Sequence, residues 1–250
     1  MKAFSVVGIT KSGKTTTIEN IIREIKRRGF SVGSIKEIHF EDFAIDTEGT
    51  NTDRHLQAGS ELVTARGYEE TDVLYQGKLP VEDILRHYTQ DYVVMEGVTD
   101  FNVPIILCVH DEEDLKKHKG RDYFDRVFMV SGVAASSKKK MLGGIPVINS
   151  EDDIVHMTDR VFDFLPDFSP ECCRACGFSC RELCARIIRG ESRRQDCKIG
   201  EARILFSVDG RKINMVPFVQ AILTDTIKAL VGNLGGYKKG KKIEITINDM

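Results

Sequence analysis

The residues with the clearest chemical meaning form a short glycine-rich segment near the start of the sequence. Residues 8–15, here called the phosphate loop, read GITKSGKT and match the pattern G-x-x-x-x-G-K-[ST]. Glycines in this pattern let backbone N–H groups turn toward phosphates, and the helix that follows presents its positive end to the same anion. The sequence therefore predicts a nucleotide-binding site. The residues expected to contact the nucleotide are Gly8, Thr10, Lys11, Ser12, Gly13, Lys14, Thr15 and Thr16.

A Mg²⁺ site is expected beside this loop, because Mg²⁺ usually accompanies nucleotide phosphates. The Thr15 hydroxyl is expected to bind the ion, and Lys14 to reach the β- and γ-phosphates. Such an ion usually has a carboxylate nearby, bound directly or through water. The candidates are Glu96, which ends the apolar run YVVME, and Asp46, which follows the second apolar run; a surface carboxylate at a strand end is the alternative for each. No clear Asn-Lys-x-Asp element is present, so this motif does not decide between GTP and ATP.

A second concentration of reactive side chains lies at residues 172–197, where six of the seven cysteines fall. Their order gives three closely spaced thiols and one remote thiol, which is a common arrangement around an iron–sulfur cluster. Structural zinc sites more often show two close cysteine pairs. We therefore expect a [4Fe–4S] cluster. The expected cluster ligands are Cys173, Cys176, Cys180 and Cys197.

Zinc, a disulfide and free thiols are the alternatives for this cysteine segment, and Cys172 could replace Cys173 as the first ligand. Cys184 and the isolated Cys108 are instead expected to be buried core residues. The run CRACGFSC also resembles the small iron–sulfur domain of electron-transport complex B subunits and of corrinoid iron–sulfur proteins. It is one residue shorter between the second and third cysteines.

The elements that must position both sites alternate between strands and helices. Residues 2–8 predict a buried strand, and the isoleucines that follow the phosphate loop repeat at helical spacing up to Gly29. Such alternation predicts an α/β fold with a P-loop NTPase-like, mostly parallel sheet flanked by helices. Further strands are expected at 30–38, 61–67, 91–98, 103–110, 125–133 and 145–149, and further helices at 52–59, 80–88 and 150–165, the last capped by Ser150.

Two prolines in PDFSPE, residues 166–171, indicate a domain boundary. Residues 1–166 are expected to form the nucleotide-binding domain, and residues 167–250 a small cysteine-rich iron–sulfur α+β domain. Within the second domain, two apolar runs around Asp209–Gly210 predict a hairpin. An amphipathic helix at 217–236 and a closing strand at 241–249 are expected to follow.

The sequence as a whole is expected to belong to a cytoplasmic protein. The net charge of −2 gives no reason to expect a nucleic-acid or membrane partner. The apolar start of the chain is too short for a signal peptide, and no run approaches the roughly 20 apolar residues of a membrane span. A reducing cytoplasm disfavours structural disulfides, which adds weight to the cluster interpretation of the cysteines.

Residues 1–165 resemble the MobB-type adapters of molybdenum-cofactor biosynthesis. The resemblance runs from the phosphate loop to Ser60 and includes DYVVMEGV at 91–98. Outside the loop, the positions of this sequence that match the family pattern are Lys36, Asp42, Asp46, Gly49, Arg54, His55, Ala58, Gly59, Glu96 and Gly97. The sequence departs from the family pattern at Glu37, where histidine is usual, and at 98–99, where Val-Thr replaces Phe-Lys. It departs again at 50–52, where Thr-Asn-Thr replaces Lys-Asp-Ser.

The resemblance implies a homodimer that binds GTP and Mg²⁺ with weak hydrolysis. It implies assistance to a molybdenum-cofactor guanylyltransferase, and a molybdenum or tungsten enzyme as the final recipient. No constellation for nucleophilic catalysis stands out, which favours an adapter over a transferase. The alternative is an NTP-driven redox or metal-insertion maturation factor, although Ile9 stands where such proteins often carry an extra lysine. A third interpretation is a nucleotide-binding scaffold whose cluster is only structural.

Overall fold

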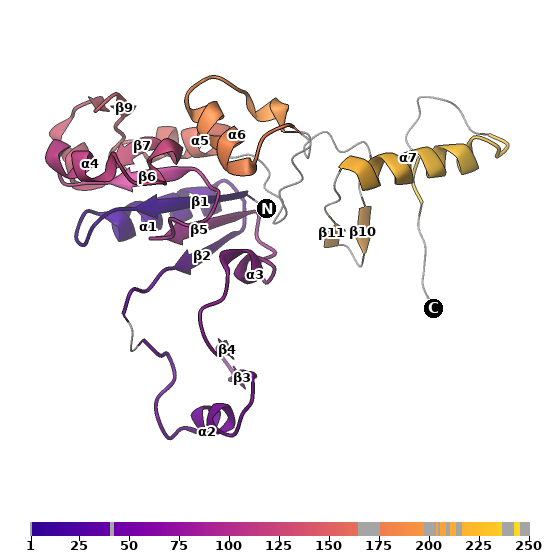
Figure 1. Cartoon of the computed structure of the whole chain (residues 1–250), viewed down its shortest axis with the longest axis horizontal. Helices are drawn as coiled ribbons and strands as arrows, with labels where there is room; N and C mark the ends of the chain where they lie inside the picture. Colours follow the sequence, from indigo (N-terminus) through magenta and orange to yellow (C-terminus); the bar gives the residue numbers. More distant parts are fainter. Residues whose placement is uncertain are drawn as a thin grey trace.

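The structure of the chain is a computed structural model that describes residues 2–40, 43–164, 176–197, 204, 206–208, 211–213, 217–236 and 243–245. Its centre is a five-stranded sheet in the order β2-β5-β1-β6-β7, and every neighbouring pair is parallel. The strands are β1 (Lys2–Val7), β2 (Val32–Lys36), β5 (Tyr92–Glu96), β6 (Ile105–Cys108) and β7 (Val127–Ser131). The predicted α/β fold with a mostly parallel sheet is confirmed (Figure 1).

Alternate residues of a strand point to opposite faces of the sheet, and each face has its own helices. Helices α1 (Lys14–Arg27) and α5 (Ile154–Phe164) pack on the face that carries Phe4, Val94 and Ile106. The opposite face is covered by α3 (Val81–Leu85), α4 (Glu112–His118) and α6 (Cys180–Ile188). Because most strands are buried on both faces, their sequences are almost continuously apolar.

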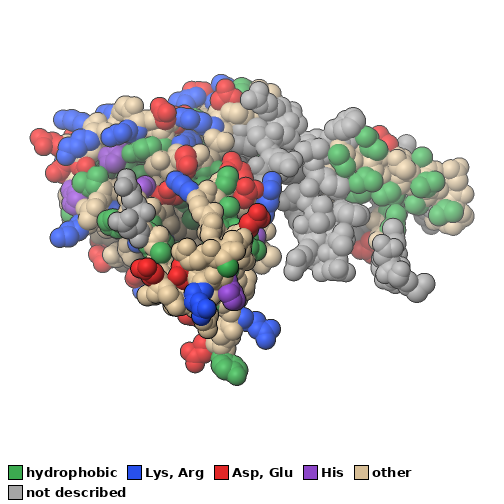
Figure 2. All heavy atoms as spheres, turned by 60° about the horizontal axis from the view of Figure 1, so that its bottom comes forward, with side chains coloured by type: hydrophobic (Ala, Val, Ile, Leu, Met, Phe, Trp, Pro, Cys, Tyr) green, Lys and Arg blue, Asp and Glu red, His purple; other side chains and the backbone are tan. Residues whose placement is uncertain are grey.

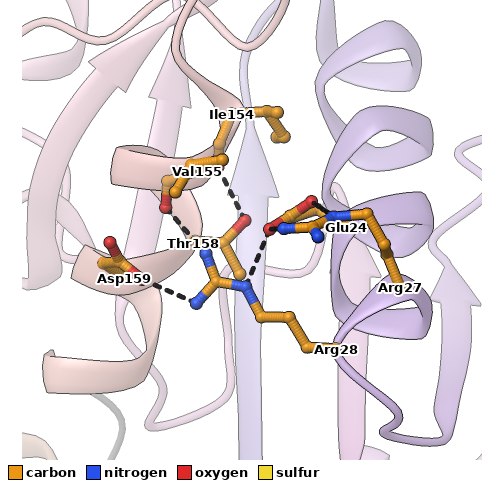
Figure 3. Close-up of polar contacts among 7 residues, drawn as sticks. All are labelled: Glu24, Arg27, Arg28, Ile154, Val155, Thr158 and Asp159. Atoms are coloured by element: carbon orange, nitrogen blue, oxygen red, sulfur yellow. Dashed lines mark hydrogen bonds and ion pairs between the residues drawn. The ribbon is translucent and has the colours of Figure 1, made fainter.

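A buried carboxylate ties α1 to α5 (Figure 3). The Glu24 side chain is 5% exposed and accepts hydrogen bonds from Arg27 at 2.7 Å and from Arg28 at 2.8 Å. Arg28 also donates to Asp159 Oδ1 at 2.6 Å and to the backbone oxygen of Val155 at 3.0 Å. The hydrogen bonds from Arg27, which have the larger effect, and from Arg28 lower the pKa of Glu24 to about 2. The helix that starts in the phosphate loop is thereby joined to the helix that precedes the cysteine segment.

Residues 37–80 leave the sheet as an extension (Figure 1). The extension contains α2 (Asn51–Gln57) and an antiparallel hairpin of β3 (Leu62–Arg66) and β4 (Thr71–Tyr75). The sequence analysis predicted no strand at the position of β4. The predicted helix at 52–59 is present, but it begins one residue earlier and ends at Gln57. Its cap is Thr50, whose Oγ1 accepts a hydrogen bond from Asp53 N at 3.2 Å.

Shorter elements connect these parts. They are η1 (Phe124–Arg126), η2 (Gly132–Ser137), β8 (Met141–Leu142), β9 (Ile145–Pro146) and η3 (Arg194–Asp196). The expectation that Ser150 caps α5 is wrong, because this helix begins at Ile154. The Ser150 hydroxyl instead accepts a hydrogen bond from Asn20 Nδ2 on α1 at 3.3 Å.

The predicted hairpin and helix of the C-terminal part are present as β10 (Phe206–Val208), β11 (Arg211–Ile213) and α7 (Pro217–Val231). The predicted closing strand at 241–249 lies mostly outside the described residues. Figure 2 shows hydrophobic side chains gathered on α7, whereas Lys, Arg, Asp and Glu are mixed over the rest of the visible face. Within the described ranges, none of the helices combines the length and apolar character that crossing a membrane requires.

Candidate nucleotide-binding site

The phosphate loop joins β1 to α1 at the edge of the sheet where all five strands end. Gly8 is packed so closely that a Cβ atom there would lie 2.1 Å from the backbone oxygen of Cys108 on the neighbouring strand β6. Gly13 is the N-cap of α1, and the first turn of this helix contains no acidic residue. The N–H groups of that turn therefore have no side-chain acceptor at the cap, and such groups bind phosphates at helix N-termini.

The other predicted loop residues divide between exposed and buried positions. Thr10, Lys11, Thr15 and Thr16 are exposed, whereas Ser12 is fully buried and donates through Oγ to the backbone oxygen of Ile9 at 2.8 Å. Lys14 Nζ donates to the same oxygen at 2.7 Å, which places its ammonium group over the loop. A phosphate above the loop would meet this charge directly.

Thr15 and Glu96, two of the three predicted Mg²⁺ ligands, are brought together. The Thr15 hydroxyl donates to Glu96 Oε1 at 3.4 Å, and Lys36 Nζ lies 3.4 Å from the same oxygen. Parallel pairing explains the contact with Lys36, because it lies opposite Glu96 at the ends of β2 and β5. A hydroxyl and a carboxylate at the start of the loop's helix are the donor groups that Mg²⁺ takes beside nucleotide phosphates.

Asp46 has its hydrogen bonds within its own segment of the extension. Its Oδ1 accepts from Thr47 N at 2.9 Å and from the Thr50 hydroxyl at 2.8 Å. The hydroxyl groups of Thr52 and Thr50 hold the pKa of this carboxyl below its usual range. Among the described residues, no hydrogen bond or ion pair joins Asp46 to Thr15 or Glu96. The geometry therefore favours Glu96 as the carboxylate of the site.

Three residues beside the loop were missed by the sequence analysis. His110 Nε2 lies 3.1 Å from the backbone oxygen of Lys11, and Val133 N donates to the backbone oxygen of Ser12 at 3.1 Å. A Cβ atom at Gly132 would lie 2.0 Å from that same Ser12 oxygen, so only glycine allows this approach. His110 follows β6 and Gly132 follows β7. Their places directly after buried strands were the available signal, since parallel strands end at one edge.

The cysteine ligand set lies partly outside the described residues. Cys173 is not described, and of Cys180 only the backbone is, as the first residue of α6. Cys176 and Cys197 are half-buried and are not joined in a disulfide, and Cys176 Sγ donates to the backbone oxygen of Phe178 at 3.5 Å. In the part of the chain that the structure describes, no group of three or more metal-binding side chains is present. The four-cysteine set remains a prediction.

The two cysteines expected in the core are buried, as predicted. Cys108 on β6 is 0% exposed, and Cys184 on α6 is 1% exposed. Burial raises the pKa of both thiols to about 12, so neither is a thiolate at neutral pH. Cys184 packs with Ala3 and Val93 of the sheet, and Arg181 forms an ion pair with Asp125 at 3.8 Å. The helix that begins at Cys180 therefore rests on the α/β unit.

A glycine-rich loop between the first strand and the first helix of a parallel α/β sheet defines this chain as a P-loop fold of the nucleotide-binding class. The family described as "Molybdopterin guanine dinucleotide synthesis protein B" matches residues 3–127, half of the chain, and the chain belongs to this family.

Individual relatives extend this finding. A provisionally named molybdopterin-guanine dinucleotide biosynthesis adapter protein of Methanocaldococcus jannaschii is 28% identical over 258 residues, covering 99% of this chain and 98% of that protein. The molybdopterin-guanine dinucleotide biosynthesis adapter protein of Haemophilus influenzae is 32% identical over 116 residues. The match covers 44% of this chain and 64% of that protein. The crystal structure of Bacillus subtilis MobB has a TM-score of 0.52 at 20% identity, covering 67% of this chain and all of that one, and shows the shared fold.

The relatives differ in how much of the chain they cover. The family match ends at residue 127, and the Bacillus subtilis structure covers 67% of the chain. The relative from Methanocaldococcus jannaschii covers 99% of the chain, so its similarity continues through the cysteine segment and the C-terminal elements.

Proposed function

We propose that the chain is a GTP-binding adapter that assists a guanylyltransferase in forming molybdopterin guanine dinucleotide. The observation that carries this proposal is the meeting of Thr15 and Glu96 beside the phosphate loop, in a chain that belongs to the synthesis protein B family. The names of the relatives from Methanocaldococcus jannaschii and Haemophilus influenzae place them in the same biosynthesis as adapters. A molybdenum or tungsten enzyme is the proposed final recipient.

The loop residues would hold the triphosphate in a defined way. Lys14 would leave its contact with the Ile9 oxygen and pair with phosphate oxygens, and the first turn of α1 would supply N–H donors. Thr15 and Glu96 would hold Mg²⁺, the carboxylate directly or through water, with Asp46 as the second candidate. When bound, Mg²⁺ neutralises phosphate charge.

The side chains around the loop favour an adapter over a transferase. The hydroxyl of Ser12 donates to a backbone oxygen, and the Cys108 thiol donates to the Thr17 hydroxyl at 3.6 Å. Neither group is thereby arranged as a nucleophile next to a base. At most slow GTP hydrolysis is expected, with the water positioned by the nucleotide site itself.

A homodimer is supported by one exposed face of the hairpin in the extension. This hairpin face consists of Leu62, Val73 and Tyr75, which are 46%, 50% and 37% exposed. Leu62 and Tyr75 lie directly opposite each other on β3 and β4. Since a two-stranded hairpin is marginally stable alone, covering this face with a second copy of the chain would stabilise it.

A [4Fe–4S] cluster on Cys173, Cys176, Cys180 and Cys197 is the further part of the proposal. Cys180 is the first residue of α6, where the positive end of a helix favours an anionic thiolate cluster. Ser179 and Glu182 form a capping box that fixes this helix start. Anaerobically purified protein should contain iron and sulfide with broad visible absorbance; the absence of all three would remove the cluster. Measuring the reversible reduction of the cluster with and without GTP then distinguishes an adapter from an NTP-driven redox factor.

The adapter role is tested by binding to the guanylyltransferase. Wild-type protein loaded with GTP and Mg²⁺ should bind the purified enzyme and raise its yield of molybdopterin guanine dinucleotide. The Lys14→Ala variant should do neither, because its loop lacks the cation that holds the triphosphate. Equal stimulation by wild-type and variant protein, or none by either, would exclude a nucleotide-dependent adapter.

A further inference from the structure

Two successive carbonyl groups of the phosphate loop are turned toward donors on neighbouring loops. The Lys11 oxygen faces His110 Nε2 at 3.1 Å, and the Ser12 oxygen accepts from Val133 N at 3.1 Å. Carbonyl oxygens repel phosphate oxygens, and anion-binding loops work by presenting N–H groups instead. Donors on the neighbouring loops hold these two carbonyl groups away from the phosphate position. This arrangement favours the binding of a phosphate by the loop.

Lys11 needs such support more than its neighbours do. Its φ angle is +61°, a left-handed conformation that residues with a Cβ atom adopt rarely. A conformation of this kind persists where surrounding groups hold it. Of the two outward donors, His110 is the one that uses a side chain, and it contacts the strained residue itself.

The His110 ring is held from its other side by a buried carboxylate. Nδ1 lies 3.4 Å from Asp114 Oδ2, and the backbone N of His110 donates to the same oxygen at 3.1 Å. Asp114 is 3% exposed, and its own backbone N donates to Asp111 Oδ1 at the cap of α4 at 2.9 Å. His118 lies on the far side of this carboxylate, with Nε2 3.8 Å from Oδ1. A ring fixed at one nitrogen presents the other in a fixed direction.

We propose that His110 is a positioning residue of the nucleotide site, whose Nε2–H holds the Lys11 carbonyl away from the phosphates. The inference rests on the proposed nucleotide function. In the sheet, β1 lies between β6, which leads to His110, and β5, which carries Glu96. His110 and the Mg²⁺ ligands therefore act on opposite sides of the loop. Loss of the His110 contact should weaken nucleotide binding equally with and without Mg²⁺.

Three substitutions and one control separate the hydrogen bond from general structure. His110→Leu removes the donor, His110→Gln keeps an N–H donor with similar reach, and His110→Asn keeps the same amide on a shorter side chain. The His110 side chain is 35% exposed, so these changes leave the core intact. His156→Leu is the matched control, because this exposed histidine of α5 pairs with Asp153, the residue before the helix. It lies on the opposite side of the sheet from α4.

GTP affinity is measured by calorimetry in Mg²⁺ and in EDTA. We expect His110→Leu and His110→Asn to lose about 5- to 10-fold in affinity under both conditions, the range for one hydrogen bond, and His110→Gln to stay within about twofold of wild type. Hydrogen–deuterium exchange of amides 9–13 in nucleotide-free protein is the second readout. Exchange of these amides should be faster in His110→Leu than in three other proteins. These are the wild type, His110→Gln and His156→Leu.

Equal GTP affinity and equal exchange in wild type and His110→Leu would overturn the positioning role. A glutamine variant as impaired as the leucine variant would also overturn it, since the donor would then not matter. If wild-type protein binds no GTP, the proposed function fails instead. The exchange of the loop amides still decides the role of His110 in that case.

Discussion

At the scale of single residues, the nucleotide site divides between groups that would meet the ligand and groups that hold the loop. Lys14, Thr15 and Glu96 belong to the first set, because each offers a charge or an oxygen beside the loop. Gly8 and Gly132 belong to the second, because a Cβ atom at either would collide with a backbone oxygen. The sequence could name the first set, since Lys14 and Thr15 are part of the motif and Glu96 ends a clear strand; their contact with a ligand remains a prediction.

Replacing Glu96 by glutamine tests the proposed metal site. One oxygen of the Glu96 carboxylate contacts both Thr15 and Lys36. Glutamine keeps the size of the side chain but removes the negative charge proposed to bind Mg²⁺. The affinity for GTP with Mg²⁺ should fall about 10-fold, while affinity in EDTA should change little. Asp46→Asn is the comparison variant and should retain its Mg²⁺ dependence, since Asp46 bonds to Thr47 and Thr50. The reverse pattern would assign the ion to Asp46.

At the scale of elements, long apolar runs made most strands predictable, whereas β4 was missed. Its sequence TDVLY is short and alternates in exposure, and its pairing with β3 gives it stability that its own composition does not indicate. The contacts of His110 and Gly132 with the loop needed more than the signal that both residues follow buried strands. They depend on strand order, in which β6 lies next to β1 and β7 lies next to β6.

The link between α1 and α5 gives a stability prediction with a defined pH dependence. Arg27 and Arg28 lower the pKa of Glu24 from 4.5 to about 2, so its contribution is complete above pH 4.5 and is lost as the pH falls toward 2. Glu24→Gln should reduce the free energy of unfolding by about 2 kcal/mol at pH 7, because charged hydrogen bonds are lost. Denaturant unfolding at several pH values measures the difference, which should shrink between pH 4.5 and 2.

Glu19→Gln is the matched control for this stability prediction. Glu19 also pairs with an arginine on α1, Arg23 at 3.0 Å, but both side chains are more than half exposed. This change should cost no more than about 0.5 kcal/mol. A Glu24 effect as small as the control, or one independent of pH, would show that the buried network does not stabilise the α1–α5 contact.

At the scale of the whole molecule, the extension and the cysteine segment are the parts that distinguish this chain from a bare P-loop domain. The boundary predicted at residue 166 remains a prediction, yet α6 beyond it already packs against Ala3 and Val93 of the sheet. The burial of Cys184 could be predicted from its helical spacing from Cys180. The surface against which Cys184 packs could not be predicted from the sequence. That surface forms only when β1 and β5 are paired.

The proposed homodimer leads to the prediction that one charge placed on the hairpin face separates the two subunits. Val73→Lys places an ammonium group in the centre of this face, next to Leu62 and Tyr75, where burial against a second copy would leave it unpaired. Light scattering after size-exclusion chromatography should report a dimer for wild type and a monomer for the variant. Val155→Lys, at a 49% exposed position on α5, should remain dimeric. A wild-type monomer, or a dimeric Val73 variant, would exclude this interface.

Calorimetric titration of the anaerobically purified chain with GTP and Mg²⁺ tests the central claim most directly. The phosphate loop should bind one GTP per chain, ATP should compete weakly, and Lys14→Ala should lose at least about 10-fold in affinity, because a charged contact to phosphate disappears. Absence of binding by either nucleotide, or GTP binding that Lys14→Ala leaves unchanged, would contradict the assignment of this loop as the nucleotide site.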